Sequence, residues 1–226
     1  MLSYYVLGWT TRAGLICNGH HRRRGLASVS INDNENAQHH PYTWQELRQH
    51  AGNQSLRYSA GEYPGRSPAG NTQYAVYKAW CRARGITNPQ YVIDYVQWHN
   101  NSALEPALAP YLLVDGIEHW VLWHHPRRLP GKTVLNPDEE QVLALSLLAI
   151  EGAHLSKGNV LCYQNVPQLR SLPTIAHSHV FLHVGVLTNA SRRLVARMRS
   201  RWEQRSPWLQ EHAARELPLA PLSSES

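Results

Sequence analysis

The clearest polar–apolar pattern in the chain lies at residues 177–184, near its C-terminal end. Three histidines, His177, His179 and His183, share one parity, and apolar β-formers occupy most positions of the other. Successive side chains of a strand point to opposite faces, so one face would pack on the core while the other displays imidazoles. Histidine suits proton transfer, nucleophilic attack and metal binding near neutral pH. The pattern predicts a strand over about 177–187 with a site on its open face.

Two strands and a helix are predicted ahead of the histidine strand. Residues 116–124 are rich in β-formers, which indicates a strand. Asn136 and Pro137 followed by three acids are a strong helix start, and apolar positions continue the helix to Ile150. Residues 160–165 have the composition of another strand. Together with the histidine strand, these elements predict a strand–helix–strand–strand core with an antiparallel sheet.

The N-terminal third carries helix signals instead. Residues 43–46 match a capping box, which opens a short helix. Further helices are expected over about 72–84, ended by Gly85, and over 91–98, where a strand is the alternative. Six arginines between 190 and 205 lie in a predicted basic helix with a solvated face. The fold class expected from these elements is α+β.

The predicted domain organisation has three parts. Residues 1–41 form a basic N-terminal extension. Residues 42–189 form the main α+β domain, with a small helical unit at 42–105 and the sheet core at 106–189. Residues 190–226 form the basic helix and a Pro/Ser-rich, disordered tail.

The first 32 residues contain four arginines and no acidic residue. This composition is typical of a mitochondrial transit peptide, and equally of a disordered basic tail. The segment has no long apolar stretch of the kind that secretion signals contain. We expect a cytoplasmic protein, with a mitochondrial location as the alternative.

Composition restricts the partners and cofactors. No apolar run approaches the roughly 18 residues of a membrane span, so we expect a soluble protein without one. Cys17, Cys81 and Cys162 are widely spaced and predict neither a disulfide framework nor a cysteine zinc site. The net charge of +6 comes mainly from arginine, whose planar guanidinium suits phosphate and carboxylate ligands. No motif for specific nucleic-acid binding is present, and a homodimer is left open.

The candidate site combines His119 of the first predicted strand with His177 and His179 of the last. Asn165 and the 166–174 loop would overlook these imidazoles. The alternatives are hydrogen-bonded structural histidines at a sheet edge, or a zinc site in which His119 or His183 completes a set with His177 and His179. No cofactor is predicted, with zinc as the alternative.

Three other residues are candidates for phosphate or carboxylate contacts. His124 lies in a turn with a second imidazole and two guanidiniums, and Arg170 and Ser171 lie in the long loop before the histidine strand. An exposed basic turn and an ordinary loop are the alternative interpretations.

Three stretches resemble the N-acetylglucosamine-induced protein family of eukaryotes: Tyr42–Leu47, Gly116–Trp123 and Asn165–Phe181. The last contains Leu169-Arg170-Ser171-Leu172-Pro173 and His177-Ser178-His179-Val180-Phe181. The similarity covers about residues 42–184. It suggests a link to amino-sugar or nucleotide-sugar metabolism.

More distantly, the chain resembles the histidine-triad (HIT) superfamily of nucleotide hydrolases and transferases. His119, the 137–151 helix, Asn165, Ser171 and the His177/His179 pair fall in the order of that family's elements. The resemblance implies a HIT-like antiparallel sheet core. It also implies His179 as the nucleophile that attacks the α-phosphorus, with His177 as the flanking histidine and Asn165 and Ser171 on the phosphate.

The chain departs from the HIT pattern at the third triad position, which is occupied by Phe181, and the loop from Ser171 to His177 is longer than usual. We therefore expect a HIT-like protein that binds a nucleotide or nucleotide-sugar phosphate ester, with His179 and His177 as catalytic candidates. His119, His124 and His183 join Asn165, Arg170 and Ser171 as substrate-binding candidates. The alternatives are a non-catalytic ligand-binding or regulatory protein of amino-sugar metabolism, or a histidine-ligated metalloprotein.

Overall fold

The computed structural model describes residues 40–52 and 63–216, with the backbone alone for 212–216. Nearly all of the predicted N-terminal extension and the tail from Leu217 lie outside the described residues. In chain order the elements are α1 (Trp44–Gly52), α3 (Pro68–Ala83), α4 (Asn88–Tyr95), β1 (Ser102–Pro106), β2 (Glu118–His124), α5 (Pro137–Ile150), η1 (Lys157–Asn159), β3 (Val160–Tyr163), η2 (Pro167–Leu169), β4 (His177–Leu182), η3 (Val184–Val186), α6 (Asn189–Arg205) and α7 (Pro207–Glu216).

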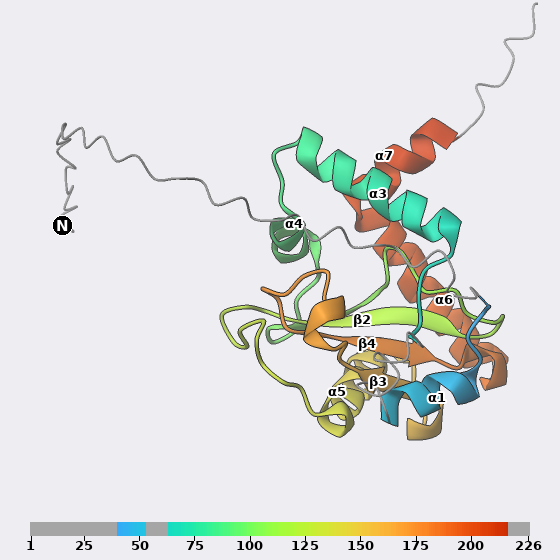
Figure 1. Ribbon diagram of the computed structural model, residues 1–226. Coiled ribbons are helices and arrows are strands. Elements are labelled where there is room, and N and C mark those ends of the chain that lie inside the picture. The colour runs from blue at the N-terminus through green and yellow to red at the C-terminus, as the bar shows by residue number, and fades with distance from the viewer. Residues whose placement is uncertain (1–39, 53–62, 217–226) are drawn as a thin grey trace, which may run out of the picture. The chain divides into compact units, whose positions relative to one another are not determined.

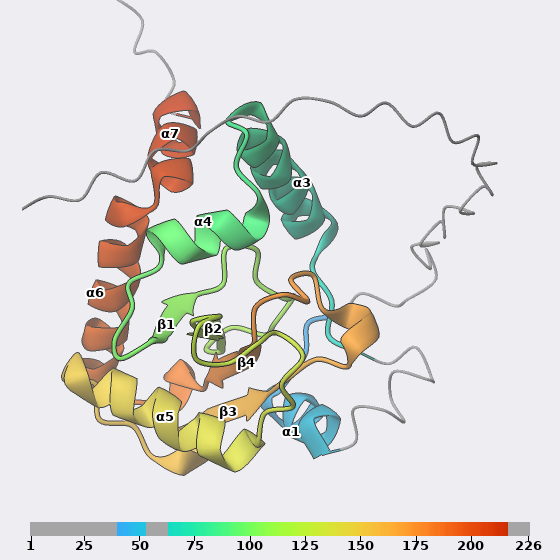
Figure 2. The same ribbon diagram turned by 90° about the vertical axis from the view of Figure 1, so that its left-hand side faces the viewer.

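Four antiparallel strands form one sheet in the order β1-β2-β4-β3. Figure 1 labels β2, β4 and β3, and Figure 2 labels all four strands. β4 lies in the centre, where Trp123 of β2 pairs with His177 and Val160 of β3 pairs with Leu182. This arrangement confirms the predicted α+β class and the antiparallel pairing of the two predicted strands with the histidine strand. All of β1 except Pro106 lies in the range predicted as a helical unit, because its short Ser-Ala-Leu-Glu-Pro sequence carries little β signal.

Helices α5 and α6 cover one face of the sheet (Figure 2). Trp120, Leu122, Val180 and Leu182 of β2 and β4 form the core there with apolar residues of both helices. Asn136 caps α5 as predicted, its side chain accepting from the Asp138 N–H. The basic helix α6 is more than a solvated surface, since its Val195 and Met198 are buried in the same core.

The other face, which carries the predicted histidine row, is also covered. Leu47 of α1 packs with Ile117, Tyr163 and Phe181 in a second apolar cluster. The capping box predicted at the start of α1 is present, because Thr43 N–H donates to Glu46 Oε2 over 2.8 Å. The prediction of an open imidazole face was therefore wrong: the aromatic residues beside the histidines require their own apolar cover.

A third cluster joins α3, α4 and α7 away from the sheet. Tyr77, Trp80, Tyr91 and Trp208 pack there, with edge-to-face contacts between Tyr77 and both Tyr91 and Trp208. In the part of the chain that is described, no helix is long and apolar enough to cross a membrane.

Candidate functional site

Pairing between β2 and β4 brings His119 and His179 into direct contact. His119 Nε2 lies 2.8 Å from His179 Nδ1, and both side chains are buried. His119 is opposite Phe181 in the register, and their rings stack 4.9 Å apart at 10°. The residue at the third triad position therefore packs on an imidazole instead of extending the row.

Two residues from outside β2 and β4 complete a hydrogen-bonded chain. The Tyr111 N–H donates to His119 Nδ1 over 3.1 Å. At the other end, His179 Nε2 lies 2.9 Å from the side-chain amide of Asn165 and 3.3 Å from the Tyr111 hydroxyl. The chain thus runs from Tyr111 through both imidazoles to Asn165 and back to Tyr111.

These contacts fix the tautomers of both histidines. His119 Nδ1 accepts from a backbone N–H, so the hydrogen of the neutral ring is on Nε2 and is donated to His179 Nδ1. The hydrogen of His179 is then on Nε2. The structure places the amide nitrogen of Asn165 at Nε2, so two donors would face each other. A 180° flip of the amide brings its oxygen to Nε2 and gives the ring hydrogen an acceptor.

The environment keeps these imidazoles neutral. Burial, with a contribution from Arg66, lowers the pKa of His119 to about 3. Burial and then the neighbouring His119 lower the pKa of His179 well below its usual value. Within the chain, His179 Nδ1 uses its lone pair to accept from His119, and Nε2 carries hydrogen, so neither nitrogen is available as a nucleophile.

His177 has the opposite tautomer. Its Nδ1 lies 2.8 Å from the Ile175 carbonyl oxygen, which can only accept, so Nδ1 carries the hydrogen and donates it. Its Nε2 therefore has a lone pair, and no residue of the described ranges 40–52 and 63–216 hydrogen-bonds to it. Burial lowers the pKa of His177, and the charge of Arg170 adds to the effect. His177 is the neutral imidazole of the group with an available nitrogen.

Arg170 lies in the loop after η2, and its charge acts on the pKa of His177. Its Nε donates to the Asn165 carbonyl oxygen over 2.9 Å, and one terminal nitrogen donates to the Gly131 carbonyl oxygen over 3.3 Å. Gly131 has no room for a side chain, because a Cβ would lie 2.3 Å from the Pro173 oxygen. This close approach of two loops fixes the guanidinium. Ser171, the next residue, is exposed.

His124 does not join this site, although it was predicted to. It lies on the opposite face of β2, where its Nε2 is 2.8 Å from Glu140 Oε2 of α5. Ser178 donates to the same carboxylate oxygen over 2.7 Å, and Ser102 Oγ lies 3.5 Å from His124 Nδ1. Side chains alternate between the two faces along β2, so His124 points to the opposite face from His119 and Trp123.

His183 is likewise apart from the imidazole group. β4 ends at Leu182, and the His183 N–H donates to the Asn159 carbonyl oxygen as the chain turns into η3. The His183 ring stacks on Trp44 of α1 at 4.8 Å. The predicted strand to residue 187 was too long, so the parity argument no longer applied to His183.

The structure therefore brings together five predicted residues, His119, Asn165, Arg170, His177 and His179. Two important residues were not predicted. Tyr111 lies in an irregular segment whose sequence gave no signal. Glu140 was interpreted as a dipole-stabilising acid, although its spacing to the buried Ala144 and Leu147 placed it on the core face of α5. Among the described residues, no group of three or more histidines, cysteines or acids is arranged to hold a metal ion.

Comparisons with known proteins add little to this geometry. No family model matches the chain, and no curated protein matches it. A solved structure, the crystal structure of HTC1, is similar over 71% of this chain and 96% of its own length, with 22% identity and a TM-score of 0.46. A likeness at that level supports no conclusion about the site.

Proposed function

We propose that the protein binds the phosphate ester of a nucleotide or nucleotide sugar at His177 and Arg170. The observation that carries this proposal is the hydrogen bond from His177 Nδ1 to the Ile175 carbonyl oxygen. It leaves Nε2 with a lone pair, and the charge of Arg170, whose guanidinium two backbone carbonyls orient, acts on the same ring. A phosphate ester offers oxygens to the guanidinium and an electrophilic phosphorus to the imidazole.

Arg170 is the anion-binding group of this proposal. Its two carbonyl contacts use Nε and one N–H of one terminal nitrogen, so several of its five N–H groups remain for a ligand. The adjacent Ser171 hydroxyl is exposed and close in sequence. The order of His119, Asn165, Ser171 and His177/His179 along the chain, which resembles the HIT superfamily, is consistent with a phosphate at this position.

Transfer chemistry, where it occurs, would use His177 as the nucleophile. The Nε2 lone pair forms the P–N bond, and the leaving group departs with the electron pair of the broken P–O bond. The Ile175 carbonyl accepts from Nδ1–H and stabilises the positive charge that develops on the ring. Water would then attack the phosphorus and release His177. His119 and His179 would support the strand beneath it.

A second candidate is a ligand-binding or regulatory protein without catalysis. The observation that favours it is the closed hydrogen-bonded chain at His179, in which the nitrogen expected to attack carries hydrogen. Phe181, stacked on His119, also replaces the third histidine.

Calorimetric titration with UMP, AMP, UDP-N-acetylglucosamine and inorganic phosphate tests binding. We expect His177→Gln and Arg170→Gln each to weaken binding at least tenfold. The first loses the contact of the imidazole with the phosphate ester, and the second loses the charge-assisted hydrogen bonds of the guanidinium. The exposed His154→Gln and Arg82→Gln are matched controls and should bind as the wild type does.

Mass spectrometry of the acid-quenched and base-quenched protein distinguishes the two candidates. A base-stable, acid-labile adduct at His177 supports transfer, whereas binding without an adduct supports the regulatory protein. The proposal fails if none of the four ligands binds, or if His177→Gln and Arg170→Gln bind like the controls.

A further inference from the structure

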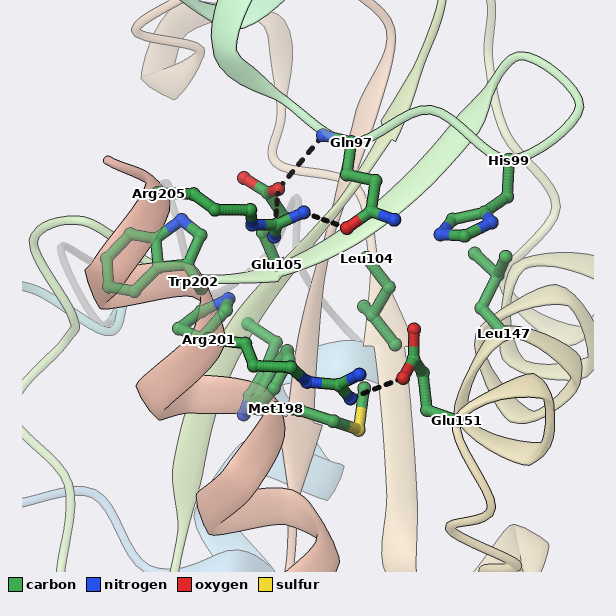
Figure 3. A pocket seen from close by; sticks show the side chains of 12 residues that line it. Gln97, His99, Leu104, Glu105, Leu147, Glu151, Met198, Arg201, Trp202 and Arg205 are labelled. Carbon is green, nitrogen blue, oxygen red and sulfur yellow. Dashed lines mark hydrogen bonds and ion pairs between the residues drawn. The ribbon is translucent and has the colours of Figure 1, made fainter. Parts of the chain in front are cut away.

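A cavity of about 40 Å³ lies at the free edge of β1, on the face of the sheet covered by α5 and α6 (Figure 3). Leu104 of β1, Leu147 of α5 and Met198 of α6 form its apolar part, with Trp120 beneath them. This cavity is separate from the imidazole group, because Trp120 and Leu104 belong to the core on the opposite face from His119.

The backbone of β1 presents hydrogen-bonding groups at this edge. Ala107 N–H donates to His119 O and His125 N–H to Asn101 O, so the odd-numbered residues of β1 bond toward β2. The N–H and C=O of Leu104 therefore point outward, away from β2. Neither has a hydrogen-bond partner within the described residues.

Leu104 is the one position of β1 with both outward groups available. The outward N–H and C=O of Ser102 are already hydrogen-bonded to the backbone of His99, where the chain reverses direction. Pro106 has no N–H, so it cannot donate to an added strand. β1 can therefore pair with a single extended residue, and the proline limits any longer pairing.

Side-chain parity places the cavity next to that residue. A residue directly opposite Leu104 points its side chain to the same face as Leu104. On that face lie Leu147 and Met198, which line the cavity. An aliphatic side chain is the group that the apolar part of the cavity, between Leu104, Leu147 and Met198, would accept.

The charges around the cavity are balanced. Arg205 contacts both Gln97 and Glu105, the latter at 3.3 Å, and Arg201 is paired with Glu151 (Figure 3). The Gln97 N–H also donates to Glu105 over 3.1 Å. Burial raises the pKa of Glu105. A phosphate would meet two carboxylates and a free amine would meet two guanidiniums, so a neutral group with both a donor and an acceptor fits best.

We infer that this cavity binds one extended residue of a neutral peptide segment, with its backbone paired to Leu104 and its aliphatic side chain between Leu147 and Met198. The site is independent of the proposed phosphate site. It uses the peptide-recognition mode in which a strand is added to a sheet edge, shortened here to one residue.

The test titrates the full chain with N-acetyl-leucine N-methylamide and follows amide and indole N–H signals by NMR. We expect saturable shifts at Leu104 and at the indole of Trp202, with a dissociation constant of roughly 1–10 mM for a ligand of this size. N-acetyl-glycine N-methylamide should bind about tenfold more weakly or less, because it has no side chain for the cavity. N-acetyl-leucine, with a carboxylate, should also bind more weakly.

Variants at Met198 locate the binding. Met198→Phe fills the cavity and should abolish the shifts, whereas Met198→Leu keeps a similar volume and should preserve them. The inference is overturned if the leucine amide causes no saturable shift at Leu104, or if the glycine amide binds equally well. Those two results come from the wild-type protein, so they hold even if Met198→Phe does not fold.

Discussion

The two faces of β4 carry two buried polar clusters built on different principles. On one face, His119 and His179 form a chain of neutral imidazoles that ends at Asn165 and Tyr111. On the other, His124 meets the carboxylate of Glu140, which also accepts from Ser178. Adjacent residues of β4, Ser178 and His179, thus contribute to different clusters.

The difference lies in whether a carboxylate is available. Without one, burial disfavours imidazolium, so His119 stays neutral and each ring must donate through one nitrogen and accept through the other. Beside Glu140, the imidazole instead has an acceptor for a charge-assisted hydrogen bond. The comparison teaches that a histidine row in the sequence does not define one site: the neighbours on each face decide what each imidazole can do.

Acidification is the largest perturbation of the neutral cluster. His119 has a pKa of about 3 in the folded protein, and the pKa values of His177 and His179 are also lowered, whereas unfolded histidines titrate near pH 6.5. Below pH 6.5 the unfolded chain binds more protons, so stability falls as the pH falls. From pH 7 to 5 the loss is about 2 kcal/mol for His119, and His177 and His179 add to it in the same direction.

Urea unfolding at pH 7, 6 and 5 measures this loss. Glu105 has the opposite sign, because its raised pKa favours protonation of the folded protein, and it acts at pH values nearer 4.5 and above. The variant His119→Gln removes one neutral imidazole and should reduce the stability lost between pH 7 and pH 5 by about 2 kcal/mol. An unchanged slope in His119→Gln would contradict the assignment of a neutral His119.

Removal of the carboxylate is the next largest change, and it acts on the opposite face. Glu140→Gln leaves His124 and Ser178 facing a neutral amide in a buried position, and should cost about 3 kcal/mol of unfolding free energy. Glu139→Gln is the matched control, since Glu139 is exposed in the same turn of α5 and should change stability by less than about 0.5 kcal/mol. Equal effects of the two variants would show that the carboxylate–imidazole pair is not formed.

The sequence predicted the elements of this core better than the site. The β-forming composition of residues 116–124 and the alternation from residue 177 were enough to predict the two central strands, and Asn136 with Pro137 was enough for the start of α5. The antiparallel pairing followed from those elements. β1 escaped notice because five residues with a glutamate and a proline have no clear strand period.

The site depended on tertiary contacts that no local pattern contains. Asn165 and Arg170 were predicted candidates that lie next to the imidazoles, but their links to Tyr111 and Gly131 arise from loops that approach only in the folded chain. The parity argument correctly grouped His177 with His179, and it failed for His183 because the strand ended one residue earlier. The roles of His177 and His179 became distinguishable only through the acceptors of their ring hydrogens.

The smallest predicted effect concerns α1, the helix that covers the neutral imidazoles of His119 and His179. Thr43 begins α1 through a reciprocal contact with Glu46, and this contact lowers the pKa of Glu46 to about 2. Thr43→Ala should cost about 1 kcal/mol, as removal of a helix cap usually does. Because α1 places Leu47 and Trp44 over the imidazole face, the variant should also speed the modification of His179 by diethyl pyrocarbonate.

The variant Thr87→Ala tests whether the modification rate depends on the cover by α1 or only on the stability of the whole protein. Thr87 caps α4 with a similar contact, its Oγ1 accepting from the Gln90 N–H over 3.2 Å. Thr87→Ala should therefore destabilise the protein by a similar amount. It should leave the modification rate of His179 unchanged, because α4 is not part of the Leu47 cluster. Peptide mapping by mass spectrometry measures that rate. If both variants expose His179 equally, α1 is not its cover, and the neutral chain is protected by global stability alone.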